Sequence, residues 1–220
     1  MGFWYGLAKA ILGAYLTAFA EVIHLRGEER MPAGAKIIVP NHPNATDAFV
    51  LPFIIPERLH FLVLEETFGL PIVGRLLALA DQIPLTLGQG RKALDIARDR
   101  LAHRDVIVIF PEGYMSRPNR LRRGCAGAVL VALQTGAPLV PVGFYVPPPF
   151  IHTLRAHVFG RETVGRWQMG GRCFVQIGAP WQISPSAQSS RSYRVLRRLT
   201  DELMVRIAGV AQQAKEEAFR

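Results

Sequence analysis

The sequence has only two cysteines, Cys125 and Cys173, and they do not form a CxxC pair. Its six histidines do not cluster at the spacing that metal ligands use. Zinc sites and disulfide frameworks both depend on such patterns. The sequence therefore predicts no metal site, no resident cofactor and a reducing, cytosolic setting.

Long uncharged apolar runs are also absent. Lys9 and Glu21 interrupt the most hydrophobic stretch, so no segment reaches the roughly 18 to 20 residues that a spanning helix needs. This excludes a conventional integral membrane protein. Half of the 220 residues are nevertheless hydrophobic and only 20% are charged, which excludes a disordered chain and predicts exposed apolar surface.

Lysine is scarce, although the formal net charge is +9 from 26 basic and 17 acidic residues. The excess is therefore arginine. Such a surplus favours an anionic partner, which could be nucleic acid, anionic lipid headgroups or a phosphorylated substrate. A GC-rich genome would produce the same arginine excess without any functional demand.

Residues 1–25 are predicted to form a helix with an apolar face. The residues that recur at spacings of three and four are Trp4, Leu7, Ile11, Tyr15, Phe19 and Val22. Aromatic residues at the start and a lone lysine are typical of a monotopic anchor at a membrane surface. A helix that closes the core, or a signal peptide, is the alternative. We expect residues 1–25 to associate with membrane and residues 26–220 to form one domain.

The rest of the chain alternates between short apolar runs and helical patterns. The expected strands are 36–39, 61–64, 83–87, 106–110, 139–146 and 173–177, and the expected helices start near 44 and cover 69–80, 91–103, 129–135 and 189–220. This alternation predicts an α/β fold, a largely parallel sheet flanked by helices. Residues 147–171 fit neither pattern and are predicted to form a loop.

The first candidate motif, Asn41-His42-Pro43-Asn44-Ala45-Thr46-Asp47, lies where a strand ends and a helix begins. In a continuous helix the side chains of His42 and Asp47 would point about 140° apart, so they meet only if the chain bends. Pro43 favours that bend. A carboxylate that holds one imidazole nitrogen leaves the other as a base for a hydroxyl. A helix-capping box and an ordinary loop histidine are the alternatives.

A second strand end carries Phe110-Pro111-Glu112-Gly113-Tyr114-Met115-Ser116-Arg117. The carboxyl ends of parallel strands meet at one edge of a sheet, so both motifs are expected to share that edge. Glu112 and Arg117 could orient a polyol and its phosphate, or the segment could be only a turn. Arg120, Arg122 and Arg123 follow as a basic cluster.

Together these residues resemble the glycerolipid acyltransferases, the 1-acylglycerol-3-phosphate acyltransferase family. His42 to Asp47 matches the H-x4-D motif, and Phe110 to Arg117 is similar to F-P-E-G-T-x-S-R with Tyr114 in place of threonine. Val140-Pro141-Val142 is similar to the final V-P-V motif. The three matches occur in the family's order.

The resemblance implies that residues 26–220 are an acyltransferase domain. His42 would be the general base and Asp47 would orient it. Glu112, Gly113, Arg117 and Pro141 would bind substrate. The donor would be an acyl-CoA or acyl-carrier-protein thioester, and the acceptor a lysophospholipid. The resemblance also implies a monotopic or peripheral enzyme on the cytoplasmic face of the cell membrane, in phospholipid biosynthesis.

One departure concerns the acceptor. The family usually has an arginine after an Ile-Pro-Val-like strand, whereas Ile83-Pro84-Leu85-Thr86 is followed here by Leu87. The phosphate would then be held by Arg91 or Lys92, or the acceptor would be another lysolipid such as an acyl-amino acid.

Backbone amides near Asn44 are expected to stabilise the oxyanion of the transition state. A thioesterase, in which water replaces the acceptor, and a lipid-binding or RNA-binding protein are the rival functions. The sequence lacks a G-x-S-x-G elbow and any aromatic RNA-binding motif, so we expect no nucleic-acid partner.

Overall fold

The computed structural model describes residues 2–20, 22–86, 88–117, 120–158, 161–184 and 192–220. Its helices are α1 (Phe3–Phe19), α2 (Asp47–Ile54), α3 (Glu65–Phe68), α4 (Val73–Leu79), α5 (Arg91–Ala102), α6 (Gly127–Thr135) and α8 (Tyr193–Glu217). Its strands are β1 (Val22–Arg26), β2 (Lys36–Pro40), β3 (Leu59–Leu64), β4 (Ile83–Leu85), β5 (Val106–Val108), β6 (Leu139–Tyr145), β7 (Ile151–Val158), β8 (Arg161–Gln168) and β9 (Arg172–Ile177). Two short 3₁₀ helices cover Glu28–Arg30 and Pro148–Phe150.

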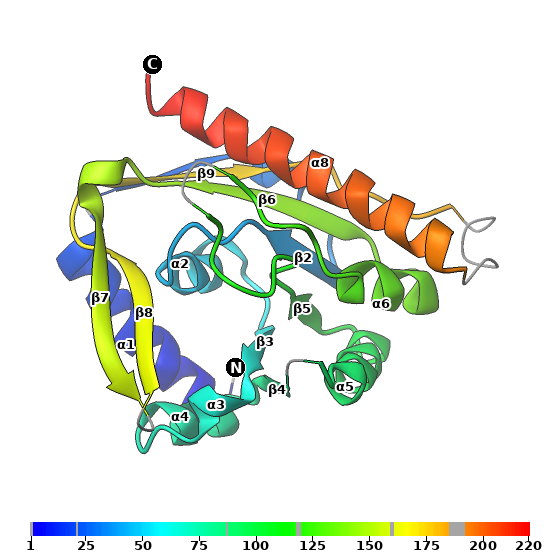
Figure 1. Ribbon diagram of the computed structural model, residues 1–220, viewed down its shortest axis with the longest axis horizontal. Coiled ribbons are helices and arrows are strands. Elements are labelled where there is room, and N and C mark those ends of the chain that lie inside the picture. The colour runs from blue at the N-terminus through cyan, green and yellow to red at the C-terminus, as the bar shows by residue number, and fades with distance from the viewer. Residues whose placement is uncertain (1, 21, 87, 118–119, 159–160, 185–191) are drawn as a thin grey trace.

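Seven strands form one sheet in the order β1-β9-β6-β2-β5-β3-β4 (Figure 1). All neighbouring strands in it are parallel except β6 and β9, which are antiparallel. Helices cover both faces, as such a sheet requires. The predicted α/β fold, a largely parallel sheet flanked by helices, is confirmed.

The central strands are apolar on both faces. Ile37, Val39 and Ile107 pack toward α5, α6 and α8, whereas Ile38 and Val108 pack toward α1 and α2. This alternation follows from the period of two residues in a strand. The continuous apolar runs in the sequence therefore belong to strands that are buried between two helical layers.

Gly143 allows α8 to lie directly on the sheet. A Cβ atom at Gly143 would lie 2.3 Å from the backbone carbon of Val210 in α8. No side chain fits in that space. Figure 1 shows α8 running along β6 and β9, and the missing Cβ sets how closely the helix approaches them.

The N-terminal segment differs from the prediction. The helix ends at Phe19, and residues 22–26 form β1, which pairs with β9 in parallel. The predicted helix over residues 1–25 is therefore too long. No helix in the described residues is long and apolar enough to span a membrane.

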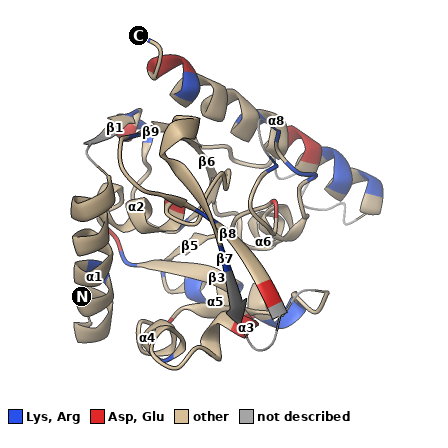
Figure 2. Ribbon diagram, turned by 60° about the vertical axis from the view of Figure 1, so that its left-hand side comes forward, with Lys and Arg blue, Asp and Glu red and all other residues tan. Residues whose placement is uncertain are grey.

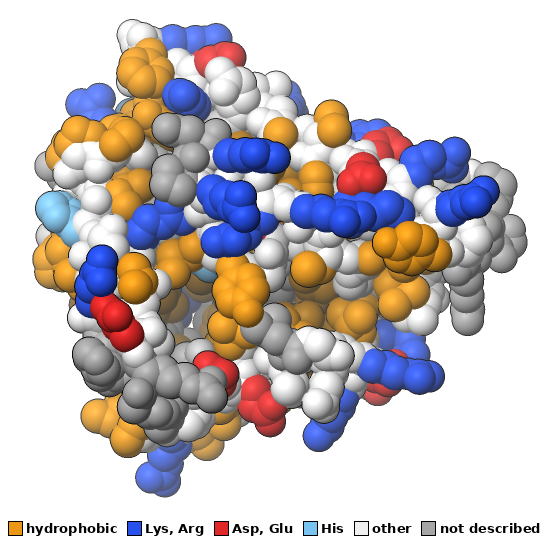
Figure 3. Space-filling view, viewed as in Figure 1, with side chains coloured by type: hydrophobic (Ala, Val, Ile, Leu, Met, Phe, Trp, Pro, Cys, Tyr) orange, Lys and Arg blue, Asp and Glu red, His pale blue; other side chains and the backbone are white. Residues whose placement is uncertain are grey.

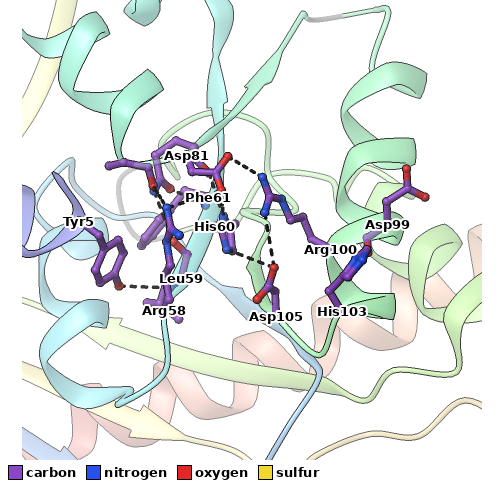
Figure 4. A network of polar contacts seen from close by, with 12 residues as sticks. Tyr5, Arg58, Leu59, His60, Phe61, Asp81, Asp99, Arg100, His103 and Asp105 are labelled. Carbon is purple, nitrogen blue, oxygen red and sulfur yellow. Dashed lines mark hydrogen bonds and ion pairs between the residues drawn. The ribbon is translucent and has the colours of Figure 1, made fainter. Parts of the chain in front are cut away.

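Two tyrosines fix one side of α1 to the domain. The Tyr5 hydroxyl accepts a hydrogen bond of 3.1 Å from the amide of Leu59, and Tyr15 donates one of 2.7 Å to the carbonyl of Gln168. Tyr5 joins a polar network around the buried His60, whose Nδ1 lies 2.8 Å from the carbonyl oxygen of Asp81 (Figure 4). This network lies at the amino ends of β3, β4 and β5, opposite the edge that carries the two motifs.

Residues 147–171 do not form the predicted loop. Most of this segment is the antiparallel hairpin β7–β8, paired from Ile151 and Gln168 to Val158 and Arg161. The hairpin extends away from the main sheet (Figures 1 and 2). Much of its surface stays exposed, so its residues lack the alternation of apolar and polar types by which a half-buried strand is detected.

We expect Gly143→Ala to lower the free energy of unfolding by about 1–3 kcal/mol, because the added methyl group overlaps the backbone of α8. The matched control is Gly209→Ala in α8, where a Cβ atom meets no atom within 4 Å. That substitution should raise the free energy of unfolding by about 0.5–1 kcal/mol. Urea unfolding of both variants measures the two changes, and equal effects would contradict the assigned contact.

Candidate active site

The two sequence motifs lie side by side because β2 and β5 are parallel neighbours. The first motif follows β2, which ends at Pro40, and the second follows β5, which ends at Val108. Asn41 extends the sheet beyond β2, since its side chain accepts a hydrogen bond of 2.7 Å from the amide of Phe144 and donates one of 3.0 Å to the carbonyl of the same residue. The predicted shared edge is confirmed.

His42 and Asp47 meet at this edge. His42 lies in the loop and Asp47 is the first residue of α2, so the bend at Pro43 brings the two side chains together. His42 Nδ1 lies 3.4 Å from Asp47 Oδ2. The histidine side chain is 20% exposed and the carboxylate only 1%, so the imidazole alone is accessible from outside.

The loop geometry also fixes the Asp47 carboxylate. Its Oδ2 accepts a hydrogen bond of 2.8 Å from the amide of Asn44. Burial raises the pKa of Asp47, and the nearby imidazole and the Asn44 amide oppose that rise. Both of these contacts favour the ionised carboxylate that would hold an imidazolium.

Glu112 joins the two loops from the inside. Its Oε1 accepts hydrogen bonds from the His42 amide at 3.1 Å and from the Ser116 hydroxyl at 2.5 Å, and its Oε2 accepts one from the Arg122 amide at 2.7 Å. The Ser116 amide in turn donates to the carbonyl of His42 at 2.7 Å. Glu112 is 3% exposed, so its carboxylate positions the backbone of His42.

Gly113 and Phe110 complete the second loop. Gly113 has a φ of +70°, and its amide donates to the carbonyl of Phe110 at 3.1 Å, which closes a tight turn that favours glycine. The Phe110 ring lies 4.2 Å from the imidazole of His42, measured between ring centroids. This contact holds the imidazole against one side of the loop.

Four arginines line a cavity of about 400 Å³ beside these loops, together with Glu112, Tyr114 and Leu121. They are Arg117, Arg120, Arg122 and Arg123. Figure 3 shows Lys and Arg side chains gathered over the loop of residues 110–125 and along α8. Four guanidinium groups outnumber the single carboxylate in this lining, so the cavity carries net positive charge and suits a phosphate group.

The family model described as Acyltransferase matches residues 22–145, more than half of the chain. The chain belongs to the acyltransferase family. The matched range contains His42, Asp47, Glu112 and Arg117.

The curated relatives are 1-acyl-sn-glycerol-3-phosphate acyltransferases. The proteins from Cocos nucifera, Limnanthes douglasii and Homo sapiens are 29%, 27% and 28% identical over 48%, 59% and 66% of this chain. The matches cover 36%, 47% and 55% of those proteins, so the chain corresponds to about half of their length or less.

A solved structure has the same fold over almost the whole chain. It is the 1-acyl-sn-glycerophosphate (LPA) acyltransferase PlsC from Thermotoga maritima, with a TM-score of 0.70 and 21% identity, covering 98% of this chain and 80% of that one. The α/β architecture described above is therefore an acyltransferase fold.

Two residues expected to bind substrate lie away from these acyltransferase loops. Arg91 is exposed at the start of α5, beyond the edge strand β4, and it lines neither the arginine cavity nor the groove beside α8 described below. Pro141 is buried inside the sheet, between β2 and β9. Their roles in substrate binding stay predictions, and Leu87 lies outside the described residues.

The expected oxyanion amides near Asn44 are not free. The amides of Asn44, Ala45 and Thr46 donate to Asp47 Oδ2, the Arg166 carbonyl and Asn44 Oδ1 at 2.8, 2.8 and 2.9 Å. These bonds build the turn into α2, so that prediction is wrong for all three amides. Of the three donors, only the Asn44 amide contacts Asp47.

Strand β8 supplies contacts that the sequence analysis missed. Arg166 donates a hydrogen bond to the carbonyl of Ser116, its own carbonyl accepts from Ala45, and the Gln168 amide donates to the Thr46 hydroxyl at 3.1 Å. The hairpin therefore contacts both loops of the candidate site. Arg166 is one of three arginines in a segment without periodicity, so the sequence gave no signal of this role.

Asp47→Asn should make the protein more stable than wild type at neutral pH. Burial raises the pKa of Asp47 in the folded protein above its value in the unfolded chain. The Asp47 carboxyl therefore contributes its full stabilisation of the fold below the unfolded-state pKa, and this contribution is lost as pH rises through the folded-state pKa. The gain from the uncharged amide should therefore shrink as pH falls. Melting temperatures between pH 4 and pH 8 measure it.

The control for this pH dependence is Asp201→Asn. The hydrogen bond from Arg197 holds the pKa of the exposed Asp201 below its usual range, so the sign is opposite. Asp201→Asn should cost a small amount of stability at neutral pH, and that loss should vanish in acid. A common pH trend for both variants would contradict the assignment for Asp47.

Proposed function

We propose that this protein transfers a fatty acyl group from a thioester to the free hydroxyl of 1-acylglycerol 3-phosphate, in phospholipid biosynthesis. The observation that carries the proposal is the juxtaposition of the His42–Asp47 pair with a cavity lined by four arginines. The names of the curated relatives support this acceptor. The donor is acyl-CoA or acyl carrier protein.

The acceptor's phosphate binds in the arginine cavity. Arg117 and Arg120 line this cavity and also the groove beside α8 that contains Pro43 and Ser116. Guanidinium groups bind phosphate oxygens through paired hydrogen bonds, which fix orientation as well as position. The glycerol hydroxyl is thereby directed toward the imidazole of His42.

His42 then acts as the general base. Its Nε2 takes the proton of the acceptor hydroxyl, while Nδ1 faces Asp47, whose carboxylate stabilises the imidazolium. The hydroxyl oxygen attacks the thioester carbonyl, the carbon–sulfur bond breaks, and the thiolate receives the proton from the imidazolium. Positioning of the two substrates could itself supply about 7–11 kcal/mol of the barrier reduction.

The protein associates peripherally with the cytoplasmic face of the cell membrane through α1. Phe3, Trp4 and Ile11 are 74%, 42% and 51% exposed on this helix, on the side away from its buried tyrosine Tyr5. Helix α4 packs against α1, and Ile72, the residue just before α4, is 83% exposed. An exposed apolar surface of this kind favours the acyl boundary of a bilayer over water.

Replacement of His42 tests the catalytic role. We expect His42→Ala to reduce thiol release from palmitoyl-CoA in the presence of lysophosphatidate by about 10²- to 10⁴-fold. The control is His103→Ala, an exposed histidine at the end of α5, which should retain wild-type turnover. Thiol release by wild type without any acceptor would replace the proposal with a thioesterase.

Replacement of the exposed residues of α1 tests membrane association. We expect Trp4→Glu combined with Ile11→Glu to weaken cosedimentation with phosphatidylglycerol vesicles by about tenfold or more. The control is Tyr193→Glu, which changes a residue at the start of α8 that is 75% exposed, more than Trp4 or Ile11. Unchanged vesicle binding by the α1 variant would exclude α1 as the attachment site.

A further inference from the structure

A groove of about 780 Å³ lies between α8, the carboxyl end of β6 and the start of the β7–β8 hairpin. Its lining includes Asn41, Pro43 and Ser116 from the two catalytic loops. The groove is therefore continuous with the site of the His42–Asp47 pair. Its volume suits a ligand of a few hundred daltons.

One stripe of α8 forms a wall of the groove. Met204, Ala208, Ala211 and Lys215 follow one another at spacings of four, three and four residues, and all line it. Ala208 and Lys215 are about 10 Å apart along the helix axis. The wall is thus long, narrow and mostly apolar, and it carries a cation toward its end.

The charges in the groove are all positive. Arg117, Arg120, Arg166 and Lys215 line it, and its described lining contains no carboxylate. Arg117 and Arg120 also line the arginine cavity, and Arg166 is bonded to Ser116. Lys215 lines the groove but not the arginine cavity, and it has no ion-pair partner in the described part of the chain. The groove therefore suits a long, weakly polar ligand with one phosphate.

We propose that this groove binds the phosphopantetheine arm of the acyl donor, with the arm's phosphate at Lys215 and the thioester over Pro43 and Ser116. The inference rests on the proposed acyl transfer and adds the location of the donor. Coenzyme A and a carrier protein share this arm, so one groove serves either source.

The position of the groove favours the donor over the acceptor. In Figures 1 and 2, α8 lies on the side of the domain away from α1. With the exposed face of α1 on a membrane, α8 lies on the part of the domain farther from the bilayer (Figures 1 and 2). A coenzyme A or carrier-protein thioester arrives from water, whereas the lysolipid acceptor is held in the bilayer.

The first test fills the groove. Ala208→Trp adds an indole to an exposed position on the lining stripe, and we expect it to raise the KM for palmitoyl-CoA by about tenfold or more. The KM for lysophosphatidate should stay within about twofold. The matched control is Gln213→Trp, an exposed position on α8 that does not line the groove, which should change neither constant. A rise in the KM for lysophosphatidate alone would overturn the assignment.

The second test concerns the phosphate. Lys215→Glu should weaken the binding of 4′-phosphopantetheine by about tenfold and leave the weaker binding of pantetheine unchanged. The control Arg198→Glu reverses an exposed charge on α8 outside the groove and should change neither affinity. Equal losses for both ligands, or for both variants, would contradict a phosphate contact at Lys215.

Calorimetric binding separates this inference from the proposed reaction. Wild-type protein that binds 4′-phosphopantetheine, with the binding lost in Ala208→Trp, supports the groove even if no acyl transfer is detected. Wild-type protein that transfers acyl groups but binds no phosphopantetheine, or whose binding survives Ala208→Trp, overturns the groove and leaves the reaction intact. Coenzyme A and holo-carrier protein, titrated in parallel, identify the source of the arm.

Discussion

The buried carboxylate of Glu112 is the contact on which the arrangement of the site depends. A carboxylate is costly to bury unless its oxygens accept hydrogen bonds, and here they accept three, from both loops. One of the donors is the amide of His42 itself. The imidazole can therefore stay fixed relative to Asp47 while the arginines outside change partners. The positive charge of the adjoining cavity comes from its four arginines, which outnumber this one carboxylate.

The sequence predicted the location of the site because that location follows from topology. Each motif follows an apolar strand, and the carboxyl ends of parallel strands lie at one edge, so His42, Asp47 and Glu112 had to approach one another. The part played by Glu112 could not be predicted. A carboxylate next to arginines suits substrate contact on sequence alone, and only the coordinates reveal that backbone amides and a hydroxyl occupy it. The acceptors of the amides near Asn44 could not be predicted either, because they belong to the loop itself and to Arg166 in β8.

The two errors in the fold predicted from the sequence have one physical cause. Residues 22–26 continue the apolar pattern of α1, and nothing local marks them as a strand, because their partner β9 begins at Arg172. The β7–β8 hairpin likewise owes its position to distant residues, since Tyr15 and Phe49 hold Trp167 at 6.3 and 6.0 Å between ring centroids. Short-range periodicity detects helices such as α5 and α8 well. It cannot detect strands whose stability comes from contacts made far along the chain.

The pairing of β1 with β9 also determines when the sheet can be completed during synthesis of the chain. Val22 of β1 pairs with Arg172 of β9, 150 positions later in the sequence, so β1 has no partner until that stretch has been synthesised. Throughout that interval α1 is joined to an unpaired strand, with its aromatic residues uncovered. In a nascent chain the sheet beside α1 would therefore stay incomplete until β9 emerges, so the final position of this helix depends on a contact between residues far apart in the sequence.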